Sequence, residues 1–125
     1  YPSMRVIQFA FGDDRTNMHL PKNVRKNMFY YTGTHDNPTT LSWWRALSEN
    51  DRSRAADYLG RKRMKAPDTF IKAVMDSRAE TAMIPMWDIL SLGDEGRVNR
   101  PGVTGGNWTW RMEKIPCEPF DLSRR

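Results

Sequence analysis

The residues best suited to chemistry in this sequence of 125 residues are an adjacent imidazole and carboxylate, His35 and Asp36. The segment before them, Met28 to Thr34, is rich in aromatic and β-branched residues, which favours a strand. Asn37-Pro38-Thr39 then supplies a capping side chain and a proline where a helix can begin. The pair therefore falls where a strand ends, and this is the end at which α/β proteins bind ligands and project catalytic residues.

Two interpretations of this pair stay open on spacing alone. In the first, Asp36 accepts hydrogen bonds from the hydroxyls of a sugar, His35 donates one more, and the ionised carboxylate stabilises positive charge during glycosidic bond cleavage. Such chemistry usually needs two carboxylates beside the scissile bond, and one suitable acid is evident here. In the second, Asp36 and Asn37 only cap the helix that follows.

Other kinds of site find less support in the sequence. A nucleophile-elbow pattern is absent, and the glycines lack the spacing of phosphate-binding or dinucleotide-binding loops. His19 and His35 are the only histidines, so we predict no metal site. The remaining acids of interest are expected to lie in turns, exposed to solvent: Asp13, Asp14, Asp88, Asp94 and Glu95.

Three strands are predicted along the chain. Met4 to Phe11 is a short apolar run ended by Gly12-Asp13-Asp14, and Met28 to Thr34 is the second strand. The third begins at Thr81 and is expected to end at Pro85, because proline removes a backbone donor from the strand ladder. A loop or helical turn should take over from there to Leu90.

Three helices are predicted between the second and third strands. The first runs from about Pro38 to Ser48, with Trp43 and Trp44 expected to pack in the core. The second runs from about Asp51 to Leu59 and should be ended by Gly60. The third begins at Ala66-Pro67-Asp68. Its apolar stripe is predicted to consist of Phe70, Ile71, Val74 and Met75.

This alternation predicts an α/β fold in which parallel strands are joined by helical crossovers, with residues 1–125 forming one segment. Three strands are too few to close a barrel. The chain is therefore expected either to be part of a larger α/β sheet or to form a homo-oligomer that covers its exposed strand edges.

Composition narrows the choice of partners and compartment. The 20 Lys and Arg against 15 Asp and Glu give a net charge of +5, and much of the excess lies between Arg52 and Lys65. We interpret this basic cluster as a solvated helix face and expect no nucleic-acid partner. Cys117 is the single cysteine, which favours a reducing, cytoplasmic compartment, and no apolar run is long enough to predict a membrane span. Because the chain does not begin with Met, we also expect it to be a piece of a longer protein.

Four blocks of this sequence resemble, in the same order, the C-terminal part of the 4-alpha-glucanotransferase family, also called amylomaltases or disproportionating enzymes. The resemblance covers nearly the whole chain. The blocks are Met4 to Phe11, Tyr31 to Thr40, Ile84 to Gly93, and Arg97 to Gly102 continuing through Gly106 to Arg111.

The resemblance implies a (β/α)8 TIM barrel and a retaining transfer of α-1,4-glucan segments between malto-oligosaccharides, with no required organic cofactor. Asp36 then corresponds to the family's third catalytic carboxylate, which grips sugar hydroxyls at the cleavage point and stabilises the transition state. His35 corresponds to a hydrogen-bonding residue of the same subsite, and Asn99 to a residue of a loop near bound glucan.

The resemblance also implies what this chain lacks. The family's nucleophilic aspartate and acid/base glutamate belong to earlier barrel strands, so the isolated chain is expected to be inactive. The alternative is a non-catalytic, oligomerising interaction module derived from the barrel. Three positions depart from the family pattern: Lys22 where histidine is common, Pro38 where an acid is common, and Trp87 where glutamine is common.

Overall fold

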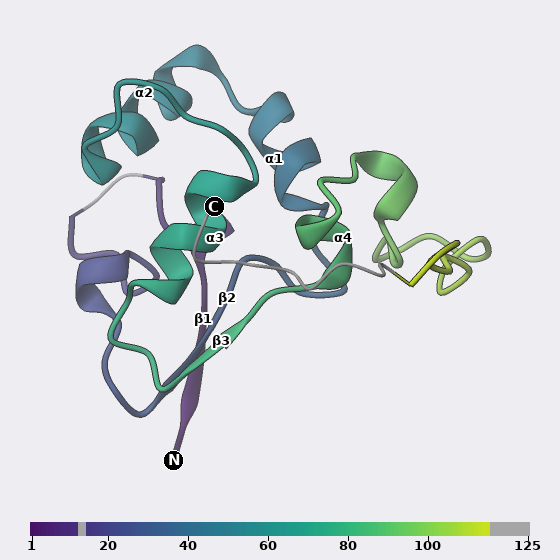
Figure 1. The fold of residues 1–125 in the computed structure, drawn as a ribbon, viewed down its shortest axis with the longest axis horizontal. Coiled ribbons are helices and arrows are strands. Elements are labelled where there is room, and N and C mark those ends of the chain that lie inside the picture. Colours follow the sequence, from purple (N-terminus) through teal and green to yellow (C-terminus); the bar gives the residue numbers. More distant parts are fainter. Residues whose placement is uncertain (13–14, 116–125) are drawn as a thin grey trace.

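The fold is built on a short parallel sheet. The computed structural model describes residues 1–12 and 15–115. In it, β1 (Ser3–Val6), β2 (Met28–Tyr31) and β3 (Thr81–Met83) pair in parallel in the order β1-β2-β3 (Figure 1). The predicted parallel strands with helical crossovers are therefore confirmed. The sheet is open, with β1 at one edge and β3 at the other.

The first strand is shorter than the sequence predicts. After Val6 the chain turns into the 3-10 helix η1 (Ile7–Phe9) instead of continuing as a strand to Phe11. Val6, the last residue of the β1–β2 pairing, donates its N–H to Nδ1 of His19 at 3.0 Å. Burial drives the turn, because Ile7 and Gln8 are both covered there.

The other two strands end close to where polar and proline residues predict. β2 stops at Tyr31, although the Thr32 N–H still donates to the Met83 carbonyl at 3.3 Å. β3 stops at Met83, and a single helical turn, α4 (Met86–Ile89), begins just after Pro85. The prediction that a helical turn replaces the strand at Pro85 is confirmed.

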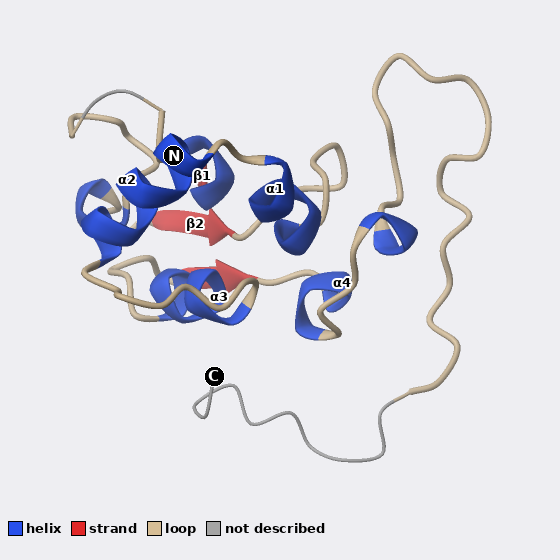
Figure 2. Ribbon diagram, turned by 90° about the horizontal axis from the view of Figure 1, so that it is seen from above, coloured by secondary structure: helices blue, strands red, loops and turns tan. Residues whose placement is uncertain are grey.

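Three helices, α1 to α3, lie between β2 and β3 in the chain, and the first two are capped by side chains at their N-termini (Figure 2). α1 spans Thr40–Ala46, α2 Glu49–Leu59 and α3 Asp68–Met75, with further 3-10 turns η2 at Pro21–Asn23 and η3 at Asp94–Gly96. Ser48 accepts the Asp51 N–H at 3.1 Å at the start of α2. Gly60 ends α2 with a left-handed φ of 63°, as predicted.

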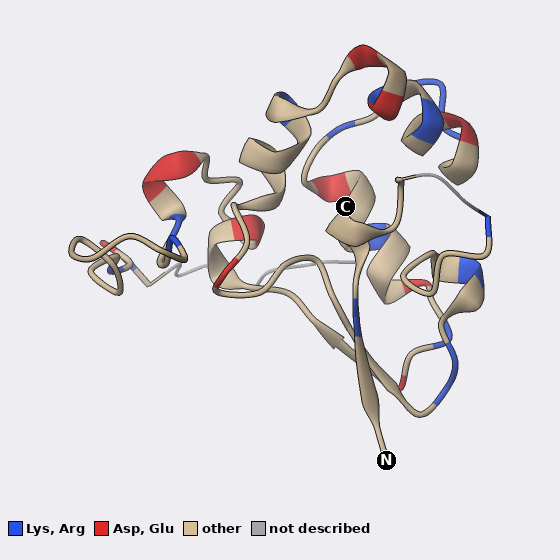
Figure 3. Cartoon of the chain, turned by 180° about the vertical axis from the view of Figure 1, so that it is seen from behind, with Lys and Arg blue, Asp and Glu red and all other residues tan. Residues whose placement is uncertain are grey.

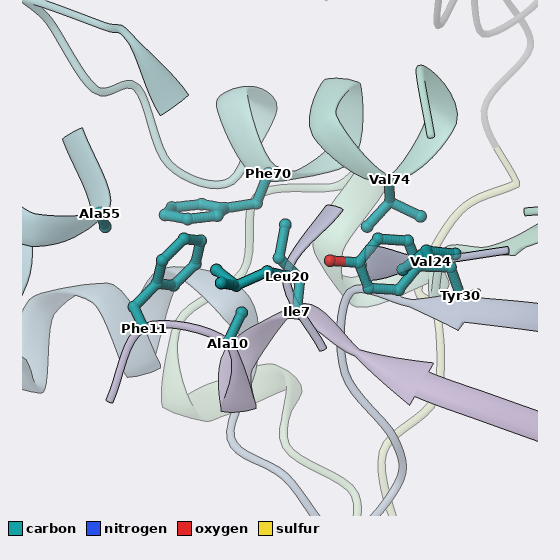
Figure 4. Close-up of a cluster of buried hydrophobic side chains, with 9 residues drawn as sticks. All are labelled: Ile7, Ala10, Phe11, Leu20, Val24, Tyr30, Ala55, Phe70 and Val74. Carbon is teal, nitrogen blue, oxygen red and sulfur yellow. The ribbon is translucent and has the colours of Figure 1, made fainter. Parts of the chain in front are cut away.

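The hydrophobic core joins one face of the sheet to the helices (Figure 4). Tyr30 of β2 and Phe70 of α3 are fully buried, and Phe70 contacts the rings of Trp43 and Trp44 with centroids 5.1 and 5.4 Å away. The predicted core role of both tryptophans is thus confirmed. Met75 was expected in the apolar stripe of α3, but it is 42% exposed because the helix ends there and turns it outward.

The opposite face of the sheet is apolar and uncovered. Met4 pairs with Phe29 and Tyr31 pairs with Met83, and side chains in parallel register point to the same face. Met4, Phe29 and Met83 are 49%, 39% and 41% exposed. An open apolar face of this kind usually lies against further protein.

The basic cluster between Arg52 and Lys65 does not form one helix face (Figure 3). Arg61, Lys62, Arg63 and Lys65 are exposed in the loop after α2. Arg52 is used within the fold, where it lies 5.6 Å from the Trp44 ring and donates to the Trp44 carbonyl at 3.1 Å. None of the helices in the described part of the chain combines the length and apolar character needed to cross a bilayer.

Candidate functional site

A tight turn after β2 presents the predicted pair. The Asn37 carboxamide oxygen accepts hydrogen bonds from both the backbone N–H and the hydroxyl of Thr34, each at 2.8 Å, and the Asn37 N–H donates to the Thr34 carbonyl at 3.1 Å. His35 and Asp36 lie at the tip of this turn. α1 is capped instead by Thr39, which accepts the Ser42 N–H at 3.2 Å. The interpretation of Asp36 and Asn37 as helix caps is therefore wrong.

The Asp36 carboxylate is oriented by a residue far along the chain. Asn99 Nδ2 donates to Asp36 Oδ1 at 2.6 Å, which is short for an N–H···O hydrogen bond. Arg97 fixes both partners, because its Nη2 donates to the Asp36 carbonyl at 3.2 Å and its Nε to the Asn99 carbonyl at 2.9 Å. The structure thus brings together Asp36 and Asn99, two of the three residues proposed from the sequence.

His35, the third of these residues, lies beside the same carboxylate. Its Nε2 is 3.3 Å from Asp36 Oδ2, and the two side chains are 54% and 51% exposed. Because Asn99 occupies Oδ1 and the imidazole approaches Oδ2, the carboxylate keeps lone pairs on both oxygens for an incoming ligand. The pair is therefore held in place while remaining accessible to solvent.

Trp108 is a site residue that the sequence reasoning missed. Its ring lies 5.2 Å from the His35 ring, at an interplanar angle of 38°, and it is 57% exposed. Its backbone has a φ of 61°, a left-handed conformation that is rare for a bulky residue, and its N–H donates to the Val98 carbonyl at 2.6 Å. Gly105-Gly106, just before Asn107, indicates a sharp turn in the sequence, but no local pattern predicts that the Trp108 ring lies beside His35.

A cavity of about 330 Å³ opens next to the pair, at the carboxyl ends of β2 and β3. His35 lies on its wall, and Trp87 closes another side by packing edge-on against Trp110 at 6.0 Å. Trp87, which stands where glutamine is common in the family, therefore adds an aromatic ring to the wall of the cavity. The cavity is lined by Met4, Tyr31, Gly33, Thr34, His35, Met83, Ile84, Pro85 and Trp87.

Asp88 behaves differently from the sequence expectation of a solvated turn residue. It is 1% exposed and accepts hydrogen bonds from the Thr32 hydroxyl at 2.6 Å, the Thr40 N–H at 2.8 Å and the Thr40 hydroxyl at 2.7 Å. Burial raises the pKa of this carboxyl, and the three donors oppose that rise. The expectation is wrong because Asp88 begins no exposed turn; it points from α4 into the protein.

The other predicted acids give a mixed result. Asp94 and Glu95 are exposed, as expected, whereas Asp13, Asp14 and the single cysteine Cys117 lie outside the described residues. Within residues 1–12 and 15–115, no three His, Cys, Asp or Glu side chains are grouped so that they could hold a metal ion.

Comparison with known proteins identifies the family. A family model described as 4-alpha-glucanotransferase matches residues 1–117. The chain belongs to this family. Its sequence is 47% identical over 115 residues to the 4-alpha-glucanotransferase of Aquifex aeolicus, covering 90% of this chain and 24% of that protein. It is 43% identical over 112 residues to the chloroplastic/amyloplastic 4-alpha-glucanotransferase of Solanum tuberosum, covering 89% of this chain and 19% of that protein.

Solved structures of this family agree with the fold. The chain matches an amylomaltase from Streptococcus agalactiae, solved in complex with acarbose, with a TM-score of 0.85 and 30% identity over 91% of this chain and 23% of that one. A 13% identical amylomaltase from Corynebacterium glutamicum matches with a TM-score of 0.56, which supports the fold alone. The chain spans about a quarter or less of the length of these relatives.

Proposed function

We propose that residues 1–125 form the C-terminal part of the (β/α)8 barrel of a 4-alpha-glucanotransferase that transfers α-1,4-glucan segments between malto-oligosaccharides with retention of configuration. The observation that carries this proposal is the Asp36 carboxylate, half exposed at the carboxyl end of the sheet and oriented by Asn99 at 2.6 Å. Active sites of (β/α)8 barrels are built at this end of the strands.

In this proposal Asp36 stabilises the transition state. Glycoside cleavage passes through an oxocarbenium-like transition state, and a fixed, ionised carboxylate stabilises its positive charge while accepting sugar hydroxyls. His35 donates a further hydrogen bond to the same sugar, and Asn99 contributes to substrate binding by orienting the Asp36 carboxylate. Support for a sugar ligand comes from the name of the Streptococcus agalactiae structure, which was solved with acarbose.

The nucleophile and the acid/base come, in this proposal, from polypeptide outside these 125 residues. Retaining glycoside chemistry places two further carboxylates about 5–5.5 Å apart. The side-chain contacts of Asp36 are made with Asn99 and His35, neither of which is a carboxylate. The isolated chain is therefore expected to be inactive, and incubating it with maltotriose should release no glucose above a buffer control.

The uncovered sheet face supports the barrel part of the proposal. The interior of a (β/α)8 barrel is filled by side chains from the inner faces of its parallel strands. Met4, Phe29 and Met83 form such an apolar face here, and the strands follow one another in sequence order across the sheet. Five further strands would close the barrel over this face.

The test is Asp36→Asn in the intact protein that carries these residues. The amide keeps the shape of the side chain but removes its charge, so turnover of maltotriose should fall about 10²- to 10³-fold, as for loss of one preorganised electrostatic contact. Asp57→Asn, an exposed acid on α2, is the matched control and should keep full activity. Near-normal turnover of Asp36→Asn would refute the assignment.

A second function, an oligomerising module without catalysis, is favoured by one observation. β1 and β3 are each paired on one side only, so each leaves a free edge in the described structure. Light scattering of the isolated chain distinguishes the two proposals. Dimers or larger assemblies would favour the module, whereas a stable, well-folded monomer would argue against it.

A further inference from the structure

We infer that Asp88 is a positioning residue that fixes both ends of the loop carrying His35 and Asp36. This inference rests on the proposed function and extends it to a residue that touches no substrate. The inference follows from the hydrogen bonds of this one buried carboxylate, which accepts from the residues on both sides of that loop.

The contacts of Asp88 span the whole loop. Its Oδ2 accepts the hydroxyl of Thr32, the first residue after β2, at 2.6 Å. The same oxygen accepts the Thr40 hydroxyl at 2.7 Å, and Oδ1 accepts the Thr40 N–H at 2.8 Å, at the first residue of α1. Residues 33–39 therefore run between two anchor points that are joined through a single side chain.

The cost of burying this carboxylate argues for a specific role. A buried charge is expensive unless it is paired or fully hydrogen-bonded, and Asp88 is 1% exposed. Three neutral donors, two threonine hydroxyls and one backbone N–H, satisfy it. α4 is only four residues long, and its one buried residue is this carboxylate-bearing Asp88.

A second residue, Gln8 of η1, also holds this loop in place. Gln8 Nε2 donates to the Pro38 carbonyl at 3.0 Å and lies 3.5 Å from the Thr40 hydroxyl. It also packs so close to Gly33 that a Cβ added there would lie 2.6 Å from it. Gln8 and Asp88 thus hold the loop by hydrogen bonds, and its exposed tip carries His35 and Asp36.

Positioning of this kind acts on the rate of the chemical step. A misplacement of about 1 Å at a catalytic group can cost roughly 10²-fold in rate. We expect Asp88→Asn in the intact protein to lower kcat on maltotriose about ten- to a hundred-fold with little change in KM. The variant keeps one acceptor oxygen, but its NH2 group cannot accept the hydrogen bonds that the second carboxylate oxygen receives. Asp76→Asn, an exposed acid that pairs with Lys72 on α3, is the matched control.

A second set of variants tests the inference in case Asp88→Asn does not fold. Thr40→Val removes one hydroxyl and should lower kcat, whereas Thr40→Ser keeps both donors and should retain more turnover than Thr40→Val. A lower melting temperature with unchanged kcat in Asp88→Asn, or in Thr40→Val if the first variant does not fold, would overturn the inference and leave Asp88 a purely structural residue.

The outcome for Asp36 separates this inference from the proposed function. If Asp36→Asn keeps normal turnover, the proposed function fails, and the positioning role fails with it. If Asp36→Asn is impaired while Asp88→Asn and Thr40→Val keep their kcat, only the positioning role fails. Loss of kcat in both Asp36→Asn and Asp88→Asn, with recovery in Thr40→Ser relative to Thr40→Val, supports both.

Discussion

The contact between Asn99 and Asp36 allows a quantitative prediction. Asn99→Ala removes the donor that lies 2.6 Å from Asp36 Oδ1 and leaves the backbone contacts of Arg97 in place. A hydrogen bond to a charged group is worth about 1.5–3 kcal/mol when it is shielded from water. The Asp36 side chain is 51% exposed, so solvent screening reduces this to about 1 kcal/mol.

This energy corresponds to about a five-fold loss of kcat/KM, since about 1.4 kcal/mol equals a factor of ten. The assay is disproportionation of maltotriose by the intact protein, with released glucose as the signal. Asn50→Ala, an exposed position on α2, is the matched control and should behave like the unmodified protein.

A double-mutant cycle with Asp36→Asn tests the reason for the loss. If Asn99 acts by orienting the Asp36 carboxylate, Asn99→Ala should cost much less once that carboxylate is gone. Equal losses of kcat/KM in both backgrounds would show that Asn99 acts independently of Asp36 and would refute the reasoning.

Two further predictions concern stability. Phe70→Ala, at a fully buried ring, should lower the free energy of unfolding by about 3–5 kcal/mol in urea titrations, and a loss below about 1 kcal/mol would contradict its central place in the core. Burial and the nearby Arg5 lower the pKa of His19, whose Nδ1 must stay unprotonated to accept the Val6 N–H. The unfolded chain therefore binds more protons than the folded one just below about pH 6.5, so stability should fall as the pH drops through that value. Urea titrations at about pH 8 and pH 5 should show this fall, and His19→Gln should remove it; an unchanged pH dependence in the variant would contradict the assignment to His19.

Much of the site could be predicted because its signals are local. The change from aromatic and β-branched residues to His35-Asp36-Asn37 marks the turn after β2, although β2 itself ends at Tyr31 and not at the predicted Thr34. Pro85 likewise follows shortly after the end of β3 at Met83. Gly60 marks the end of α2 for the same reason, since a left-handed residue there favours glycine. These features depend on a few neighbouring residues, so the sequence contains enough to place them.

The failures share a different cause, which is a partner distant in sequence. Asp88 is a residue type that is common in exposed turns. Its burial depends on hydrogen bonds from Thr32 and Thr40, which lie 56 and 48 positions away in the sequence. β1 ends early at a turn that buries Ile7 and Gln8, and the Val6 N–H just before it binds His19, 13 positions away. The place of Trp108 beside His35 likewise depends on how a long loop returns to the sheet. Local periodicity carries no information on such pairings.

The left-handed backbone of Trp108 has a consequence for engineering this protein. A bulky residue at a φ of 61° costs about 1–2 kcal/mol relative to glycine, which tolerates this region freely. A stability screen would therefore select glycine at this position and discard the indole ring that lies against His35. The position sets thermal stability against the exposed aromatic ring beside His35, and variants chosen for one property will lose the other.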